Sequence, residues 1–113
     1  MINNKMFVDD YQDIAVSTAI YPNTHKIVYP MIGLSGEVGE VAEKIKKTIR
    51  DNNGCFDDNI RTAIALEIGD VMWYCANLAN DLDLRLSDVL QMNVDKITTR
   101  TCNNKINGSG DNR

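Results

Sequence analysis

Residues 57–82 read DDNIRTAIALEIGDVMWYCANLANDL, and their pattern decides the fold class. Apolar residues recur every three or four positions, which is the period of an α-helix. They occupy two neighbouring faces, so the helix is apolar nearly all round, as expected for a central helix that other helices bury. We expect it to begin near Asp57 or Asp58 and to end at about Leu82. Its two stripes are Ile64, Ile68, Val71, Cys75, Leu78 and Leu82, and Leu66, Gly69, Trp73 and Ala76.

Three further helices are expected on either side of this segment. The first is expected from Val8 to Ala19, and the second from Pro30 or Met31 to about Arg50. The last is expected to follow Ser87, its N-cap, and to end at about Thr101. Residues 20–30 contain Pro22 and Pro30, which favour an ordered loop. No strand pattern competes, so we expect an all-α, four-helix-bundle-like fold in one domain, residues 1–113. Residues 103–113 are polar and contain glycines, and we expect them to form a mobile tail.

Composition excludes several classes of protein. A net charge of −4 argues against a surface that coats nucleic acid, which needs a basic stripe. The N-terminal residues lack the apolar stretch of a signal peptide, and no apolar run reaches membrane-spanning length. Cys55, Cys75 and Cys102 form no CxxC motif, so free thiols in a reducing compartment are expected and a zinc site is not. We expect a cytoplasmic protein that binds neither membranes nor nucleic acid.

Carboxylates interrupt the apolar helix at Glu67 and Asp70, and the preceding helix carries a matching pair, Glu37 and Glu40. Residues three apart share a helix face, so the two pairs can converge between adjacent helices. Four carboxylates in one place would repel one another unless a cation lay between them. Hard oxygen ligands favour Mg²⁺, with Mn²⁺ as a second choice. Chance spacing on solvated helix faces is the alternative interpretation.

The same preceding helix carries three glycines and a lysine of interest. Gly33, Gly36 and Gly39 recur at spacing three on one face, which indicates close approach of another backbone and association between copies. Lys44 lies four residues after Glu40 and is expected to pair with it on the helix surface. A phosphate-binding role for Lys44 or Lys47 is a second choice.

Several segments resemble the MazG-like nucleotide pyrophosphohydrolase family. They are Gly33–Lys44 (GLSGEVGEVAEK), Glu67–Tyr74 (EIGDVMWY) and Asn93–Lys96 (NVDK) with Arg100 beyond, supported by Tyr11-Gln12, Tyr29-Pro30 and the ending over residues 108–113. The resemblance covers nearly the whole chain. One departure is Gly36, which stands where many members carry a second acidic residue. Shorter members share this glycine. It therefore leaves open which subgroup of the family the chain resembles, but it does not change the reaction that the resemblance implies.

The resemblance implies a helical bundle that assembles as a homodimer or homotetramer, with sites near subunit interfaces. It also implies hydrolysis of a nucleoside triphosphate to a monophosphate and pyrophosphate. The positions that match the family's metal-binding, catalytic carboxylates are Glu37, Glu40, Glu67 and Asp70. Lys96 and Arg100 match residues that handle phosphates, and Asn93 matches a nucleotide-contacting position. These three lie at i, i+3 and i+7, so one helical face can present them all.

Three further side chains are candidates for substrate contacts. Tyr74 and Asn77 share a helix face with Asp70 and could meet the sugar or base, although a core role for Tyr74 is equally favoured. His25 lies in the loop before Glu37, and a dCTP-hydrolysing branch of the family has a histidine at a similar offset. An exposed loop histidine is the simpler interpretation. It is also the only histidine, so the paired Glu-x-x-His motifs of di-iron bundles are absent.

These observations predict a magnesium-dependent enzyme that converts (d)NTP and water to (d)NMP and diphosphate, trims or cleans the nucleotide pool, and favours deoxynucleotides. One alternative is a phosphoribosyl-ATP pyrophosphohydrolase. The other is a non-catalytic helical interaction module whose carboxylates bind metal only for stability. The asparagine- and isoleucine-rich composition fits an AT-rich genome such as a viral one, which would place the protein in a host cytoplasm.

Overall fold

The structure, a computed structural model, describes residues 5–102; the predicted tail, residues 103–113, lies outside the described residues. It contains four α-helices and one short 3-10 turn, and residues 5–102 contain no strand. The elements are α1 (Val8–Ser17), η1 (Asn23–His25), α2 (Val28–Asp51), α3 (Asp58–Asp81) and α4 (Leu86–Cys102). The prediction of an all-α fold is therefore confirmed.

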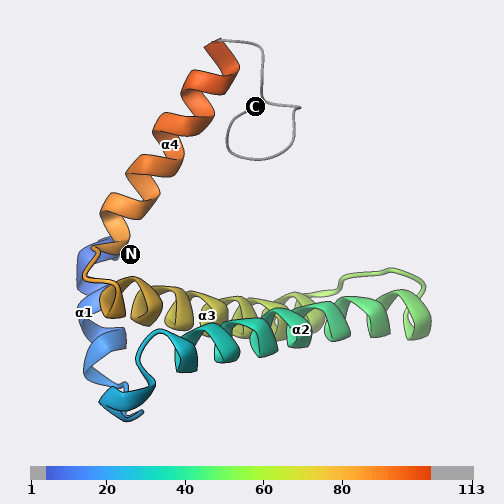
Figure 1. The fold of residues 1–113 in the computed structure, drawn as a ribbon. Coiled ribbons are helices and arrows are strands. Elements are labelled where there is room, and N and C mark those ends of the chain that lie inside the picture. The colour runs from blue at the N-terminus through green and yellow to red at the C-terminus, as the bar shows by residue number, and fades with distance from the viewer. Residues whose placement is uncertain (1–4, 103–113) are drawn as a thin grey trace.

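The two longest helices, α2 and α3, lie side by side and antiparallel, and α1 crosses them at one end (Figure 1). α4 packs against α1 and α3 near its start and then projects away from the α2–α3 pair (Figure 1). A short connection between two long helices favours such an antiparallel pair. No helix within residues 5–102 has the length and apolarity needed to cross a membrane.

Helix boundaries follow the local capping signals, with three differences from the sequence-based ranges. α3 begins as expected, because the Asp57 carboxylate accepts a hydrogen bond from the Ile60 N–H at 2.9 Å. α2 begins at Val28 rather than at Pro30 or Met31, and Pro30 is tolerated inside its first turn because the N–H groups there have no intrahelical partner. α1 ends at Ser17, two residues before the expected end.

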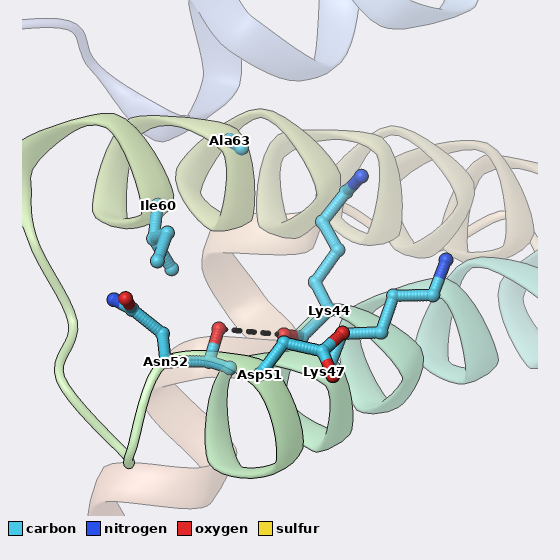
Figure 2. Close-up of a pocket in the computed structure, with 7 residues that line it drawn as sticks. Lys44, Lys47, Asp51, Asn52, Ile60 and Ala63 are labelled. Carbon is cyan, nitrogen blue, oxygen red and sulfur yellow. Dashed lines mark hydrogen bonds between the residues drawn. The ribbon is translucent and has the colours of Figure 1, made fainter.

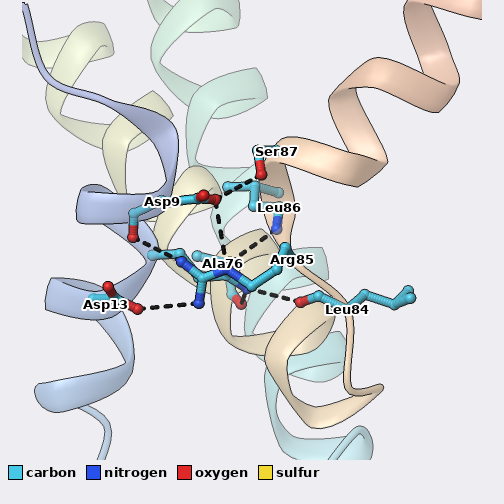
Figure 3. A network of polar contacts seen from close by, with 8 residues as sticks. Asp9, Asp13, Ala76, Leu84, Arg85, Leu86 and Ser87 are labelled. Carbon is cyan, nitrogen blue, oxygen red and sulfur yellow. Dashed lines mark hydrogen bonds and ion pairs between the residues drawn. The ribbon is translucent and has the colours of Figure 1, made fainter.

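The third difference concerns Ser87, which is not an N-cap. α4 begins at Leu86, so Ser87 lies in its first turn, and its hydroxyl donates to Asp9 Oδ1 at 2.6 Å. Arg85 donates to Asp13 Oδ1 and to the Asp9 carbonyl, both at 3.0 Å (Figure 3). This polar network joins the start of α4 to α1. The start of α4 is therefore fixed by contacts with another helix, and not by the local N-cap that the sequence predicted.

A small core forms where α1, α3 and the start of α4 meet. Its buried apolar residues are Ala15, Ala76, Ala79 and Leu86. Gln12 lies fully buried among them and forms three hydrogen bonds to backbone groups. Its amide donates to the carbonyls of Ala76 at 3.2 Å and Leu84 at 3.1 Å, and its oxygen accepts from the Leu86 N–H at 2.8 Å. Gln12 thus fixes both the end of α3 and the direction in which α4 leaves.

The expectation that α3 is buried on all sides is wrong for the single chain. Its buried residues, Ala76, Asn77 and Ala79, all lie in its last third. In its first half, Leu66 is 69 % exposed and Ile68 is 49 % exposed, so the other described residues cover this part of the helix only in part. α4 also leaves large apolar side chains exposed, with Leu90, Val94 and Ile97 on one face and Met92 on another.

The glycine pattern of α2 has a specific cause at one position. A Cβ atom at Gly33 would overlap the ring of Tyr74, so only glycine lets this ring lie against the α2 backbone. At Gly36 and Gly39 a Cβ would meet nothing within 4 Å among the described residues. The close approach expected at all three glycines therefore occurs at one of them, and it involves a side chain rather than a backbone.

Candidate metal and nucleotide site

The antiparallel pairing of α2 and α3 brings three carboxylates together. Glu37 from α2 and Glu67 and Asp70 from α3 each offer one oxygen atom, and these atoms lie within 4.8 Å of one another. Glu67 and Asp70 are three residues apart on α3, so one helix face presents both toward α2. Part of the predicted constellation is therefore assembled by two neighbouring helices.

Electrostatics within this cluster favour a bound cation. The hydrogen bond to the Glu67 carboxyl raises the pKa of Glu37, and burial and the charges of Asp70, Glu67 and Glu40 raise it further. Two carboxyl groups can share a hydrogen bond only if one holds a proton. A divalent cation would stabilise the ionised groups in place of that proton. The donor set is oxygen alone, which fits magnesium or manganese rather than zinc.

Glu40, the fourth predicted ligand, stands apart from this cluster. It is exposed one turn beyond Glu37 on α2, and it is not among the three carboxylates that converge in the described residues. Its charge still reaches the cluster, since it contributes to the raised pKa of Glu37. Within residues 5–102 the structure thus brings together three of the four predicted carboxylates.

Lys44 has a different partner from the one expected. Its Nζ lies 3.8 Å from Oε1 of Glu67 on the facing helix, rather than against Glu40 on its own helix. The contact is partly shielded, with 36 % of the Lys44 side chain and 21 % of the Glu67 side chain exposed. The carboxylate cluster therefore has a cationic neighbour, which only the pairing of α2 with α3 could reveal.

Tyr74 borders the carboxylates on the side of Gly33. Its half-buried ring lies on Gly33 and meets the Trp73 ring edge-on, with centroids 5.0 Å apart. Burial raises the pKa of its hydroxyl, and the charges of Glu37 and Asp70 are among the further causes. Tyr74 is thus both packed against α2 and electrostatically coupled to the cluster.

Asn77 and His25 have contrasting surroundings. Asn77 is 1 % exposed, and its amide donates to the carbonyls of Ala15 at 3.4 Å and Trp73 at 3.1 Å, which ties α3 to α1. It also lines a polar cavity of about 240 Å³ beside Tyr21 and Asp81. His25 is exposed on η1 and is not a member of the carboxylate cluster.

The loop between α1 and α2 is ordered by one carboxylate. Asp81, at the end of α3, accepts hydrogen bonds from the Tyr21 hydroxyl at 2.8 Å and from the Ile27 N–H at 3.0 Å. Ile27 has φ 69°, a left-handed conformation that is strained for a β-branched residue. Tyr21 also stacks on Tyr29, with ring centroids 4.8 Å apart. The predicted loop is present over residues 20–27, whereas Val28–Pro30 belong to α2, and the sequence did not reveal the role of Asp81.

Asn93, Lys96 and Arg100 lie on α4, as the helical spacing predicted. Asn93 and Lys96 are exposed, whereas Arg100 is buried. Because α4 projects away from the α2–α3 pair, the fold of one chain does not bring these residues to the carboxylate cluster (Figure 1). The carboxylates and the three α4 residues, which the family resemblance predicted to share one site, thus lie in separate parts of the chain.

Comparisons with known proteins identify relatives of this chain. Residues 12–104 match a family model described as the MazG nucleotide pyrophosphohydrolase domain. The Gene 37 protein of Mycobacterium phage L5 is 46 % identical over 114 residues, in an alignment that covers 96 % of this chain and 100 % of the phage protein. No solved structure matches the chain.

Proposed function

Since this chain belongs to the MazG nucleotide pyrophosphohydrolase family, we propose that it is a magnesium-dependent hydrolase of nucleoside triphosphates. The reaction is (d)NTP plus water giving (d)NMP plus diphosphate, with deoxynucleotides as the favoured substrates and with manganese able to replace magnesium. Its role would be to trim or clean the nucleotide pool. We further propose that it acts in the cytoplasm, which would be a host cytoplasm if the chain is viral.

The observation that carries this proposal is the convergence of Glu37, Glu67 and Asp70 within 4.8 Å. Three like charges so close together are unfavourable without a cation, and the raised pKa of Glu37 reflects that conflict. A merely solvated acidic face would let its carboxylates spread apart, whereas these three point from two packed helices into one place.

Different residues of the chain would have different roles in the reaction. Glu37, Glu67 and Asp70 would hold magnesium, and Glu40 would add negative charge at the exposed edge of the same site. When bound, magnesium would supply a Lewis acid and a water molecule of lowered pKa. Tyr74 would border the nucleoside, together with Asn77 and His25. On α4, Lys96 and Arg100 would neutralise phosphate charge, and Asn93 would contact the nucleotide.

We propose that a second copy of the chain completes the site. In one chain α4 projects away from the carboxylates, so Lys96 and Arg100 need another copy to reach a cluster (Figure 1). Large apolar side chains on α3 and α4, such as Leu66 and Met92, are more than 60 % exposed in the single chain. Covering them would stabilise a homodimer or homotetramer through the hydrophobic effect.

The test is release of pyrophosphate from a panel of NTPs, dNTPs and phosphoribosyl-ATP, measured with magnesium, with manganese and with EDTA. The proposal predicts metal-dependent release from at least one nucleoside triphosphate, with the monophosphate as co-product. Release from phosphoribosyl-ATP alone would support a phosphoribosyl-ATP pyrophosphohydrolase instead. If no substrate in the panel released pyrophosphate while metal still raised the melting temperature, the chain would be a non-catalytic metal-stabilised module.

A further inference from the structure

We propose that Lys44 binds the pyrophosphate end of the substrate, so that the triphosphate runs along α2 from Tyr74 toward the α2–α3 connection. This inference rests on the proposed function, which supplies a polyphosphate substrate. It adds a substrate-binding residue and a direction in which the substrate lies.

The charges on α2 change sign along one face. Glu37, Glu40, Lys44 and Lys47 follow one another at spacings of three and four, so all four lie near one stripe of the helix. Lys44 lies seven residues beyond Glu37, a rise of about 10 Å along the helix axis. A metal held near Glu37 would therefore have the ammonium groups of Lys44 and Lys47 on the side that leads to the α2–α3 connection.

Lys44 is already in contact with the carboxylate cluster. Its Nζ is 3.8 Å from Glu67 Oε1, and about a third of its side chain is exposed, so this is a loose ion pair. A divalent cation on Glu67 would compensate the carboxylate charge and repel the neighbouring ammonium group. The nearest anionic partner for Lys44 would then be a phosphate oxygen of a substrate that shares the metal.

A cavity next to Lys44 offers room for the phosphates. It has a volume of about 250 Å³, and Lys44, Lys47 and Thr48 contribute to its lining (Figure 2). Asp51 also lines it, but both of its carboxylate oxygens accept hydrogen bonds from Arg50 at 2.9 Å, which compensates its charge. Ile60 and Ala63 make the opposite wall apolar, and the ammonium ends of Lys44 and Lys47 extend away from Ile60 (Figure 2), so phosphates would meet these lysines at the edge of the cavity.

The opposite end of the cluster is suited to the nucleoside. Tyr74 lies on Gly33, one turn before Glu37, and its ring presents an aromatic surface. Along α2 from its start, the Tyr74 ring comes first, the carboxylate cluster second, and Lys44 and Lys47 last. This order matches a nucleoside, the metal-bound scissile phosphate and the leaving pyrophosphate.

The test uses inorganic pyrophosphate as the probe, with the full chain in magnesium and isothermal titration calorimetry. Lys44→Met should weaken pyrophosphate binding by about tenfold or more, the loss expected for one charge-assisted hydrogen bond. Lys44→Arg should restore most of the affinity. Lys46→Met is the matched control, because Lys46 lies on the same helix and pairs with Glu43 at 3.0 Å instead.

Binding of Mn²⁺, followed by electron paramagnetic resonance, separates a phosphate contact from a structural ion pair. We expect Lys44→Met to bind Mn²⁺ as tightly as wild type or more tightly. Loss of Mn²⁺ binding in Lys44→Met, unchanged pyrophosphate affinity, or no pyrophosphate binding by wild type would each overturn the proposal. If wild type hydrolyses no nucleotide but binds pyrophosphate through Lys44, the proposed hydrolysis is wrong, whereas the assignment of Lys44 as a pyrophosphate-binding residue is supported.

Discussion

Glu37 on α2 and Glu67 on α3 bring carboxylate oxygens within 4.8 Å of each other, and their interaction is the largest cause of the raised pKa of Glu37. A proton on one carboxyl group stabilises such a pair, and in the proposed function a bound cation would do so in its place. The contact joins the two longest helices at the carboxylate cluster, so the site's chemistry and the packing of the helices are coupled.

Neutralising Glu67 should abolish catalysis while the fold is kept. We expect Glu67→Gln to lower the rate of pyrophosphate release by at least about a hundredfold, because a ligand charge is lost where phosphate charge must be stabilised. Glu43→Gln is the matched control, since Glu43 lies on α2 and pairs with Lys46 on the surface. Circular dichroism checks the helix content, and equal rates for both variants would contradict the assignment.

Magnesium should stabilise the protein more at neutral pH than at pH 4. The folded-state pKa of Glu37 is raised above its ordinary value of 4.5, so its hydrogen bond to Glu67 stabilises the fold at lower pH. That contribution is lost as pH rises through the raised pKa, and the metal can then replace the proton. Melting temperatures measured across pH with magnesium and with EDTA test this, and Glu37→Gln should flatten the dependence in EDTA.

Gly33→Ala should displace the Tyr74 ring. A Cβ at this position overlaps the ring, and such overpacking costs about 1–3 kcal/mol of unfolding free energy. The KM for nucleotide should rise as well, since Tyr74 borders the proposed nucleoside site. Urea denaturation and kinetics measure both effects. Gly36→Ala is the control, because its Cβ would meet nothing within 4 Å and should not lower stability.

Gln12→Ala should loosen α4 from the rest of the chain. The variant leaves the buried N–H of Leu86 and two carbonyls without their partner, which costs about 2–4 kcal/mol. Urea denaturation measures the loss, and hydrogen exchange should increase first in α4. Gln91→Ala, which removes an exposed hydrogen bond to Asp95, should leave both measurements unchanged.

Subunit mixing tests whether the site is shared between copies. Glu67→Gln and Lys96→Gln should each be inactive alone. If carboxylates and Lys96 come from different copies, a mixed dimer contains one intact site, and about a quarter of the activity should return. If one chain supplied both, mixing would restore no activity.

Size-exclusion chromatography of Leu66→Arg, compared with Ile20→Arg on the exposed loop, tests whether the exposed surface around Leu66 on α3 is the interface between copies.

Local sequence signals were sufficient for the helices and for placing Glu67 beside Asp70 on one face of α3. The period of three to four residues predicted all four helices, and their ends were placed within a few residues because caps and prolines act over one turn. The spacing of Glu67 and Asp70 placed both on one face of α3 for the same reason. These properties depend on neighbours in the chain, and the sequence contains those neighbours.

Tertiary structure alone decided which groups from different helices meet. The partner of Lys44 is Glu67 rather than Glu40, the ring over Gly33 is that of Tyr74, and buried Gln12 directs α4 away from the carboxylates. A helical period specifies which face a side chain occupies, but contacts between helices also depend on their relative shift and angle. Those are set by side-chain packing and buried hydrogen bonds between segments more than sixty residues apart, such as Gln12 and Ala76, and no short stretch of sequence contains both partners.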